Sequence, residues 1–106
     1  MKRCIPLGTQ FKAVIKLEPI AGMSMDDYEF YAEFFCFPNH KLKVEKKEMV
    51  RKGENEYWVP INSADVGVGL LQCGVYRTIP DADFPTGERF DGNLLKLEDE
   101  IHIVKL

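Results

Sequence analysis

The sequence lacks the long hydrophobic runs that membrane-spanning or exported chains need. No stretch of about 18 apolar residues occurs in the 106-residue chain, so we expect no membrane-spanning helix. The N-terminal residues MKRCIPLGTQ include two basic side chains, but no apolar stretch of about 7–15 residues follows them. We therefore expect no signal peptide, a protein made in the cytoplasm, and no membrane partner.

Cysteine and histidine are also scarce. The three cysteines (Cys4, Cys36 and Cys73) are odd in number and widely spaced, without a C-x-x-C pair, which indicates reduced thiols rather than a disulfide framework. Cys36 and Cys73 lie in apolar runs, where we expect them to be buried and unreactive, whereas Cys4 is expected to be exposed. His40 and His102 lie far apart, and no His/Cys/Asp cluster has zinc spacing. These patterns predict no metal, no cofactor and no nucleophilic enzyme.

Strong overall charge is absent as well. The net charge is −3, which gives no overall field to draw nucleic acid or anionic lipid. The chain is 45% hydrophobic and 29% charged, as in ordinary globular proteins. A chain of this length buries roughly two-thirds of its unfolded surface. We therefore expect one domain over residues 1–106 that folds without disulfides or metal.

Alternation of apolar and polar residues is what the sequence does contain. Phe11, Ala13 and Ile15 alternate with Lys12 and Lys16, which is typical of a strand with one buried face. Similar runs recur along the chain, and no segment has a convincing helical period. The expected strands lie within 10–18, 28–37, 41–50, 57–62, 70–79, 93–98 and 101–106.

Several local features refine these strands. The aromatic-rich run 28–37 predicts a central strand that is covered on both sides for part of its length. Pro60 cannot donate to a ladder, which predicts a sheet edge, a strand end or a bulge at that residue. The last two runs predict either a kinked strand or a tight hairpin. A single helical turn capped by Ser63 is expected over 63–67. Short strands at regular spacing imply a sandwich or a barrel.

The stretch DADFPTGERFDG, residues 81–92, is the densest group of candidate functional residues. Its carboxylates could bind a hard cation or form an acid–base pair, but the spacing does not fit an EF-hand loop, and nothing supplies a cleft. Turns at 85–87 and 91–92 favour a solvated surface connection. The carboxylates concerned are those of Asp81, Asp83, Glu88 and Asp91.

Charge is unevenly distributed along the chain. Residues 41–52 hold six basic and two acidic residues, a balance of +4, whereas 81–100 hold seven acidic and two basic residues, a balance of −5. The basic run could bind nucleic acid, but lysines alternating with apolar residues are typical of a strand's solvent face. The opposite signs suggest head-to-tail contact between copies.

Two further groups could bind ligands. The glycines of GVG, 67–69, are half of a dinucleotide fingerprint, but no βαβ unit surrounds them, and positive φ at a corner is the better interpretation. Four aromatic residues could form a platform for sugar or protein, or could be core packing. They are Trp58, Tyr57, Tyr76 and Phe84.

The run from Tyr57 to Gly92 carries a resemblance to a known group of proteins. A glycine-rich step at Val66–Leu70 is followed by a strand and then by an acidic loop from Pro80 to Arg89, and the strand from Phe11 to Leu17 fits the same layout. This arrangement resembles small prophage and mobile-element proteins of gut Bacteroides-type bacteria. It resembles more distantly the immunoglobulin-like N-terminal module of phage baseplate upper proteins. Thr86 stands where the resemblance leads us to expect an acidic residue.

The resemblance implies an immunoglobulin-like antiparallel β-sandwich of six to eight short strands and implies no catalytic residues. We expect a non-catalytic structural or assembly module of a phage-derived tail or baseplate, which either stays in the cytoplasm or is incorporated into a virion. It would bind other phage structural proteins, or copies of itself as an oligomer, through strand edges and the 81–92 loop. The alternative is a carbohydrate-binding module. The candidate contact residues are Trp58, Asp81, Asp83, Phe84, Glu88 and Arg89.

Overall fold

The computed structural model describes residues 2–18, 24–36, 41–95 and 97–105, and these form an all-β fold. The described part contains ten strands and three single-turn 3-10 helices, η1 (Met25–Asp27), η2 (Lys46–Glu48) and η3 (Ser63–Asp65), and no α-helix. The strands are β1 (Lys2–Pro6), β2 (Gln10–Lys16), β3 (Phe30–Phe35), β4 (Lys41–Glu45), β5 (Val50–Gly53), β6 (Glu56–Asn62), β7 (Gly69–Leu70), β8 (Gln72–Pro80), β9 (Glu88–Leu95) and β10 (Glu100–Val104).

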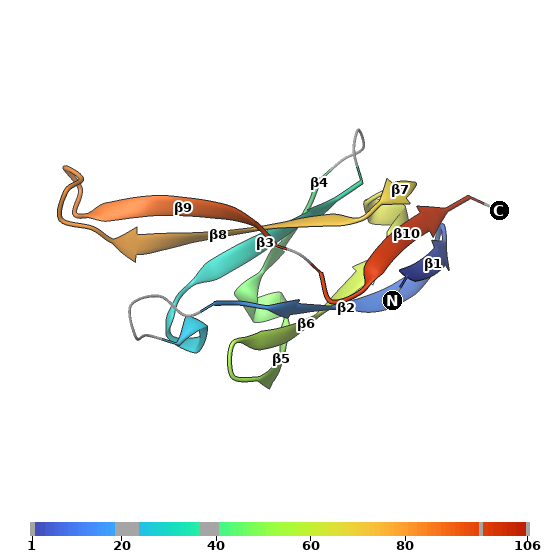
Figure 1. Ribbon diagram of the computed structural model, residues 1–106, viewed down its shortest axis with the longest axis horizontal. Helices are drawn as coiled ribbons and strands as arrows, with labels where there is room; N and C mark the ends of the chain where they lie inside the picture. The colour runs from blue at the N-terminus through green and yellow to red at the C-terminus, as the bar shows by residue number, and fades with distance from the viewer. Residues whose placement is uncertain (1, 19–23, 37–40, 96, 106) are drawn as a thin grey trace.

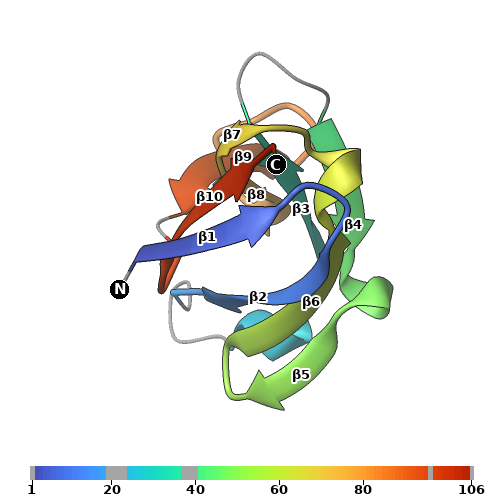
Figure 2. The ribbon, with the colours of Figure 1, turned by 90° about the vertical axis from the view of Figure 1, so that its right-hand side faces the viewer.

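The strands form three sheets, ordered β4-β3-β8-β9, β2-β6-β5 and β1-β10-β7. The third sheet lies at one end of the molecule, where β1 and β10 run side by side (Figures 1 and 2). Every described pairing is antiparallel except that of β1 with β10. The prediction of an all-β, sandwich-like fold with mainly antiparallel strands is therefore confirmed, although the described residues form ten strands rather than the expected six to eight.

The two-residue period places the core as predicted. Phe30, Ala32 and Phe34 of β3 are buried, while the intervening residues are partly exposed. The same alternation buries Tyr57, Val59 and Ile61 in β6. Leu71, Cys73 and Val75 are likewise buried in and next to β8. Apolar side chains of all three sheets form one cluster, so burial of apolar surface is the main term that stabilises the fold.

Some details differ from the sequence-based predictions. β3 is central in its sheet, as predicted, but its outer-face residues Tyr31, Glu33 and Phe35 are only partly buried, with Tyr31 covered by Tyr76. β6 is also central, but its pairing with β5 ends at Trp58, so Pro60 has only β2 beside it. Proline has no backbone N–H to donate, and at this position none is needed for a bond to β5. The turn at 63–65 is capped by Asn62, while Ser63 hydrogen-bonds to Gly8 N and Pro6 O instead.

The C-terminal half contains the largest corrections. Residues 88–92 belong to β9, so the surface connection is only 81–87, and no turn forms at Asp91–Gly92. β9 and β10 do not form a hairpin: β9 pairs with β8, whereas β10 pairs with β1 and β7. Gly67 and Gly69 adopt positive φ, as expected. Phe37, the last residue of the expected strand 28–37, and His40 lie outside the described residues.

A polar cluster ties η1 to the β5–β6 hairpin. The Asp26 carboxylate accepts hydrogen bonds from Arg51 Nη2 at 2.9 Å and from the Tyr57 hydroxyl. The Asn55 side chain, in the turn between β5 and β6, accepts from Met25 N at 2.6 Å. The Arg51 and Tyr57 contacts lower the pKa of Asp26 to about 2. Folding therefore favours the charged carboxylate.

This pKa shift predicts how stability depends on acid. Because the pKa of Asp26 is lower in the folded state than its ordinary value of 3.8, its contribution is present above about pH 4 and is lost as the pH falls towards 2. Thermal melting between pH 7 and pH 2 checks this. Asp26→Asn should have a lower melting temperature than the wild type at pH 7, and its melting temperature should fall less on acidification. Asp83→Asn should follow the wild type. Parallel acid curves for wild type and Asp26→Asn would contradict the assignment.

Candidate functional site

A hairpin made by the outer parts of β8 and β9 projects from the body of the molecule (Figure 1). We call residues 76–92 the arm. It helps to give the molecule its elongated outline of 51 × 28 × 22 Å. The arm contains five of the six candidate contact residues, Asp81, Asp83, Phe84, Glu88 and Arg89, and the exception is Trp58.

The outer face of the arm carries a row of aromatic rings. Tyr31 of β3 stacks on Tyr76 of β8, with 5.2 Å between ring centroids, and Tyr76 stacks on Phe90 of β9 at 5.8 Å. Lys43 Nζ of β4 lies 4.4 Å from the Tyr31 centroid and extends the row. The row crosses all four strands of the sheet, and its last ring, Phe90, is 63% exposed. The three rings form a continuous aromatic strip across β3, β8 and β9, partly covered at Tyr31 and Tyr76 and exposed at Phe90.

Gly92 makes room for this row. It lies opposite Tyr76 in the β8–β9 ladder, and the Tyr76 ring covers it. A Cβ at Gly92 would lie 2.7 Å from two carbons of that ring, too close for an unshifted ring. The glycine in the middle of β9 is therefore explained by close approach of an aromatic side chain.

Gly92→Ala is expected to lower the free energy of unfolding by about 1–3 kcal/mol, because the Tyr76 ring must leave its stack. Gly53→Ala is the matched control in another strand, since a Cβ there meets nothing closer than 3.9 Å, and it should change stability by at most about 0.5 kcal/mol. Urea unfolding of the three proteins checks this. Equal stability of the two alanine variants would show that the ring does not require the space.

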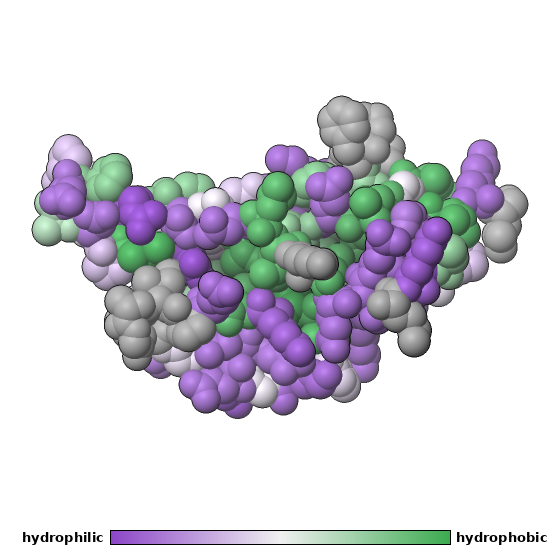
Figure 3. All heavy atoms as spheres, in the orientation of Figure 1, coloured by the Kyte–Doolittle hydropathy of each residue, from purple (hydrophilic) through white to green (hydrophobic). Residues whose placement is uncertain are grey.

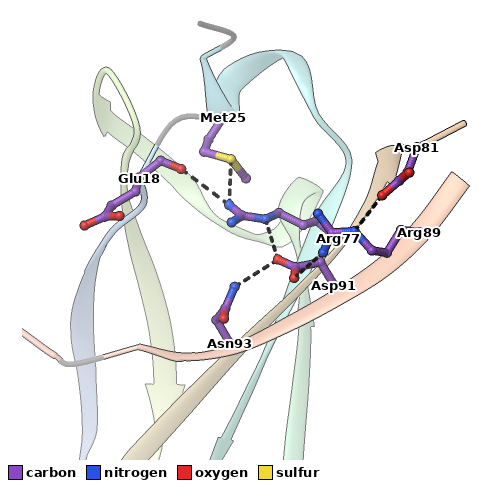
Figure 4. A network of polar contacts seen from close by, with 7 residues as sticks. All are labelled: Glu18, Met25, Arg77, Asp81, Arg89, Asp91 and Asn93. Carbon is purple, nitrogen blue, oxygen red and sulfur yellow. Dashed lines mark hydrogen bonds and ion pairs between the residues drawn. The ribbon is translucent and has the colours of Figure 1, made fainter. Parts of the chain in front are cut away.

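The inner face of the arm is polar, and Figure 4 shows its network. The Arg77 guanidinium contacts Asp91 Oδ2 at 3.3 Å and donates to Glu18 O and to Met25 Sδ in the body of the molecule. Arg89 bridges Asp91 and Asp81, at 3.1 and 3.2 Å. These contacts hold the two strands of the arm together and connect its base to Glu18, which follows β2, and to Met25 of η1.

The tip of the arm is a compact turn. Gly87 N donates to Phe84 O at 2.9 Å, as expected for a turn through Pro85 and Thr86. Asp81 accepts from Asp83 N and from Arg89. The Phe84 side chain is 44% exposed at this tip. The turn therefore presents an aromatic ring on a backbone held by internal hydrogen bonds.

Two of the four carboxylates of the arm, Asp81 and Asp91, form ion pairs with arginine, whereas Asp83 and Glu88 are exposed. Among the described residues, no group of three or more His, Cys, Asp or Glu side chains could hold a metal ion. The cysteines are buried at 36 and 73 and exposed at 4, as expected. Burial raises the pKa of Cys73 to about 12, which disfavours its thiolate at neutral pH.

Trp58 lies on the outer face of the β2-β6-β5 sheet, apart from the arm. Lys12 Nζ and Lys52 Nζ lie 4.6 and 5.6 Å from the centroid of its ring. These ammonium groups occupy the neighbourhood in which a sugar would stack. The structure therefore does not bring Trp58 together with the other candidate residues.

An open groove runs between the edges of β9 and β2. It has a volume of about 510 Å³ and is lined by Leu17, Val75, Leu94 and Leu95 together with polar residues that include Arg77 and Asn93. A second hollow of about 630 Å³ shares Leu94 and Leu95 and extends towards β10. Figure 3 shows hydrophobic surface across the middle of this face. Leu94 is 76% exposed, so apolar surface continues from the groove onto the free edge of β9.

The exposure of Phe90 and Leu94, and the partial exposure of Tyr31, were not predicted from the sequence. The signal for Phe90 was present, since Phe90, Gly92 and Leu94 alternate, but the glycines and acids around them favoured a loop.

No helix in the described part of the chain is long and apolar enough to cross a membrane. In comparisons with known proteins, the chain matches no family model, no curated protein and no solved structure.

Proposed function

We propose that this protein is a non-catalytic structural or assembly module that binds a different protein through its projecting arm. The observation that carries the proposal is the concentration of exposed apolar side chains on β9 and the preceding turn. Three of the seven exposed large hydrophobic residues of the described chain lie there: Phe84, Phe90 and Leu94. Exposed aromatic residues that lie together are typical of contact sites in protein interfaces.

The rigidity of the arm supports the same proposal. A contact surface that is already ordered loses less conformational entropy on binding. The ion pairs of Arg77 with Asp91 and of Arg89 with Asp81 order the arm before any partner arrives. The tip adds the exposed acidic side chains of Asp83 and Glu88 beside Phe84, which favours a partner surface with an apolar pocket and a basic rim.

The finer parts of the functional prediction rest on sequence alone. The immunoglobulin-like assignment and the place in a phage tail, baseplate or virion come from the resemblance described above, and they stay predictions. The carbohydrate-binding alternative also stays a prediction, and the lysines around Trp58 do not favour it.

Comparative purification from the organism that encodes the chain tests the proposal. Tagged wild type, Phe84→Ser and Val50→Ser are purified in parallel, and the co-purifying proteins are quantified by mass spectrometry. Val50 is 56% exposed on β5 and serves as the control. We expect at least one protein to be retained by wild type and Val50→Ser and reduced about tenfold with Phe84→Ser, equivalent to about 1.4 kcal/mol. Identical protein sets from all three baits would contradict binding through the tip.

A further inference from the structure

The edges of the sheets differ in how they are protected against pairing with another chain. The first and last strands of each sheet are edges within the described residues, and exposed edges pair readily unless lysine, proline, bulges or shortness prevent it. Five edge strands have such features. These are Lys2 and Pro6 in β1, Lys12 and Lys16 in β2, Lys41 and Lys43 in β4, Lys52 and a ladder irregularity in β5, and the two-residue length of β7.

β9 has little of this protection. It is eight residues long and contains neither lysine nor proline. Its basic residue, Arg89, and its inward-facing Asp91 are paired with each other, and Asp91 also pairs with Arg77. The inner-face charges of Arg89 and Asp91 are therefore paired within the chain, so another strand could cover this edge without leaving either charge unpaired.

The outer face of β9 is apolar where the edge is open. Leu94, at 76%, and Phe90, at 63%, are the most exposed of the large hydrophobic residues in the described chain. They stand two residues to either side of Gly92, on the face that carries Tyr76. A strand with this spacing about a central glycine is complementary to an antiparallel copy of itself.

We propose that β9 pairs with β9 of a second copy of this chain, antiparallel and about a two-fold axis at Gly92. The pairing places Phe90 of each copy opposite Leu94 of the other and joins two four-stranded sheets into one of eight strands. The inference rests on the proposed function in taking the arm as part of the contact surface, but it names a different partner and uses β9, which continues past the arm to Leu95.

Electrostatics select this register over its neighbour. Pairing about Gly92 places Asp91 opposite Asn93, whose side-chain amide can donate to a carboxylate, and Asn93 Nδ2 already donates to Asp91 within one chain at 2.9 Å. Pairing about Asp91 would place two Asp91 carboxylates opposite each other, which is unfavourable. Pairing about Gly92 also uses seven residues of each strand, 89–95, and covers both exposed apolar side chains.

Mass measurement by light scattering or sedimentation tests the pairing. Wild type at chain concentrations from about 10 µM to about 1 mM is expected to shift from the 12.2 kDa monomer to twice that mass. Leu94→Lys should remain monomeric because each copy would place a charge opposite Phe90. Val50→Lys, at an exposed apolar position on another edge strand, should behave as wild type. Unchanged circular dichroism and melting temperature verify that the variants fold.

Three results would overturn the pairing: a wild type that stays monomeric at about 1 mM, a Leu94→Lys variant that still dimerises, or an equal loss of dimer in Leu94→Lys and Val50→Lys. Salt separates this contact from the charge-driven contact between the basic 41–52 and acidic 81–100 segments. β9 pairing should persist at about 0.5 M salt, where exposed charges are screened, and salt-induced dissociation would contradict it. A monomeric chain whose Phe84→Ser variant still loses its co-purifying protein would remove the β9 pairing and leave the proposed function standing.

Discussion

Replacing Phe34 with alanine is expected to lower the free energy of unfolding by about 3–5 kcal/mol. Phe34 is fully buried near the C-terminal end of β3, the strand that lies between β4 and β8. Its removal leaves a cavity where the sheets meet, and this loss is a large share of the roughly 5–15 kcal/mol that stabilises an ordinary domain. Urea unfolding followed by tryptophan fluorescence measures it.

The neighbouring residue supplies the control for Phe34. Phe35 has the same side chain in the same strand, but it lies on the outer face and is partly exposed, with Lys41 Nζ 5.5 Å from its ring centroid. Phe35→Ala should cost about 1 kcal/mol or less, because little of its surface is removed from water. Equal losses for the two variants would mean that the faces of β3 are not divided between core and solvent.

Asp91→Ala is expected to cost about 2–3 kcal/mol. It removes the carboxylate that pairs with Arg77 and Arg89, whereas the Arg77 guanidinium stays largely buried. The expected cost is below the roughly 3–5 kcal/mol of a fully buried pair, because the Arg77 and Asp91 side chains are 13% and 19% exposed. Chemical unfolding measures the loss of stability. If Asp91→Ala speeds amide exchange more in β9 than in β2, relative to the wild type, the loss lies in the arm.

Two further variants isolate the charge effect. Asp83→Ala removes an exposed acid from the tip and should change stability by at most about 0.5 kcal/mol. Arg77→Met combined with Asp91→Ala should cost less than the sum of the single changes, since no buried charge is left without its partner. Additive costs would show that the two side chains do not interact in solution.

The faces of most strands were predictable because side chains alternate strictly along extended chain. That rule placed Phe34, Val59 and Cys73 inside without knowledge of sheet order. The sequence also marks the Glu54–Asn55 turn, through Gly53 before it and through Asn55, which adopts positive φ. Local chemistry was sufficient for these features because each depends on residues that are adjacent in sequence.

The features that were not predicted depend on contacts between distant residues. β1 is short and has no clear alternation, and it becomes a strand by pairing in parallel with β10 at the opposite end of the chain. β9 begins at Glu88, although GERFDG has the composition of a loop. The glycine in this strand is explained by a distant contact, since Gly92 lies beneath the ring of Tyr76 in β8. The exposure of Leu94 likewise depends on what the fold leaves uncovered, and a hydrophobicity pattern alone indicates the wrong environment.

The most direct test of the central claim, that the arm is where this protein meets another, is site-specific photo-crosslinking in cells of the source organism. A photoreactive phenylalanine analogue is placed at Phe84 or, as a control, at Val50, and the products are identified by mass spectrometry. We expect a light-dependent adduct with a different protein from position 84 and none from position 50. No adduct from position 84, or the same adduct from both positions, would contradict it.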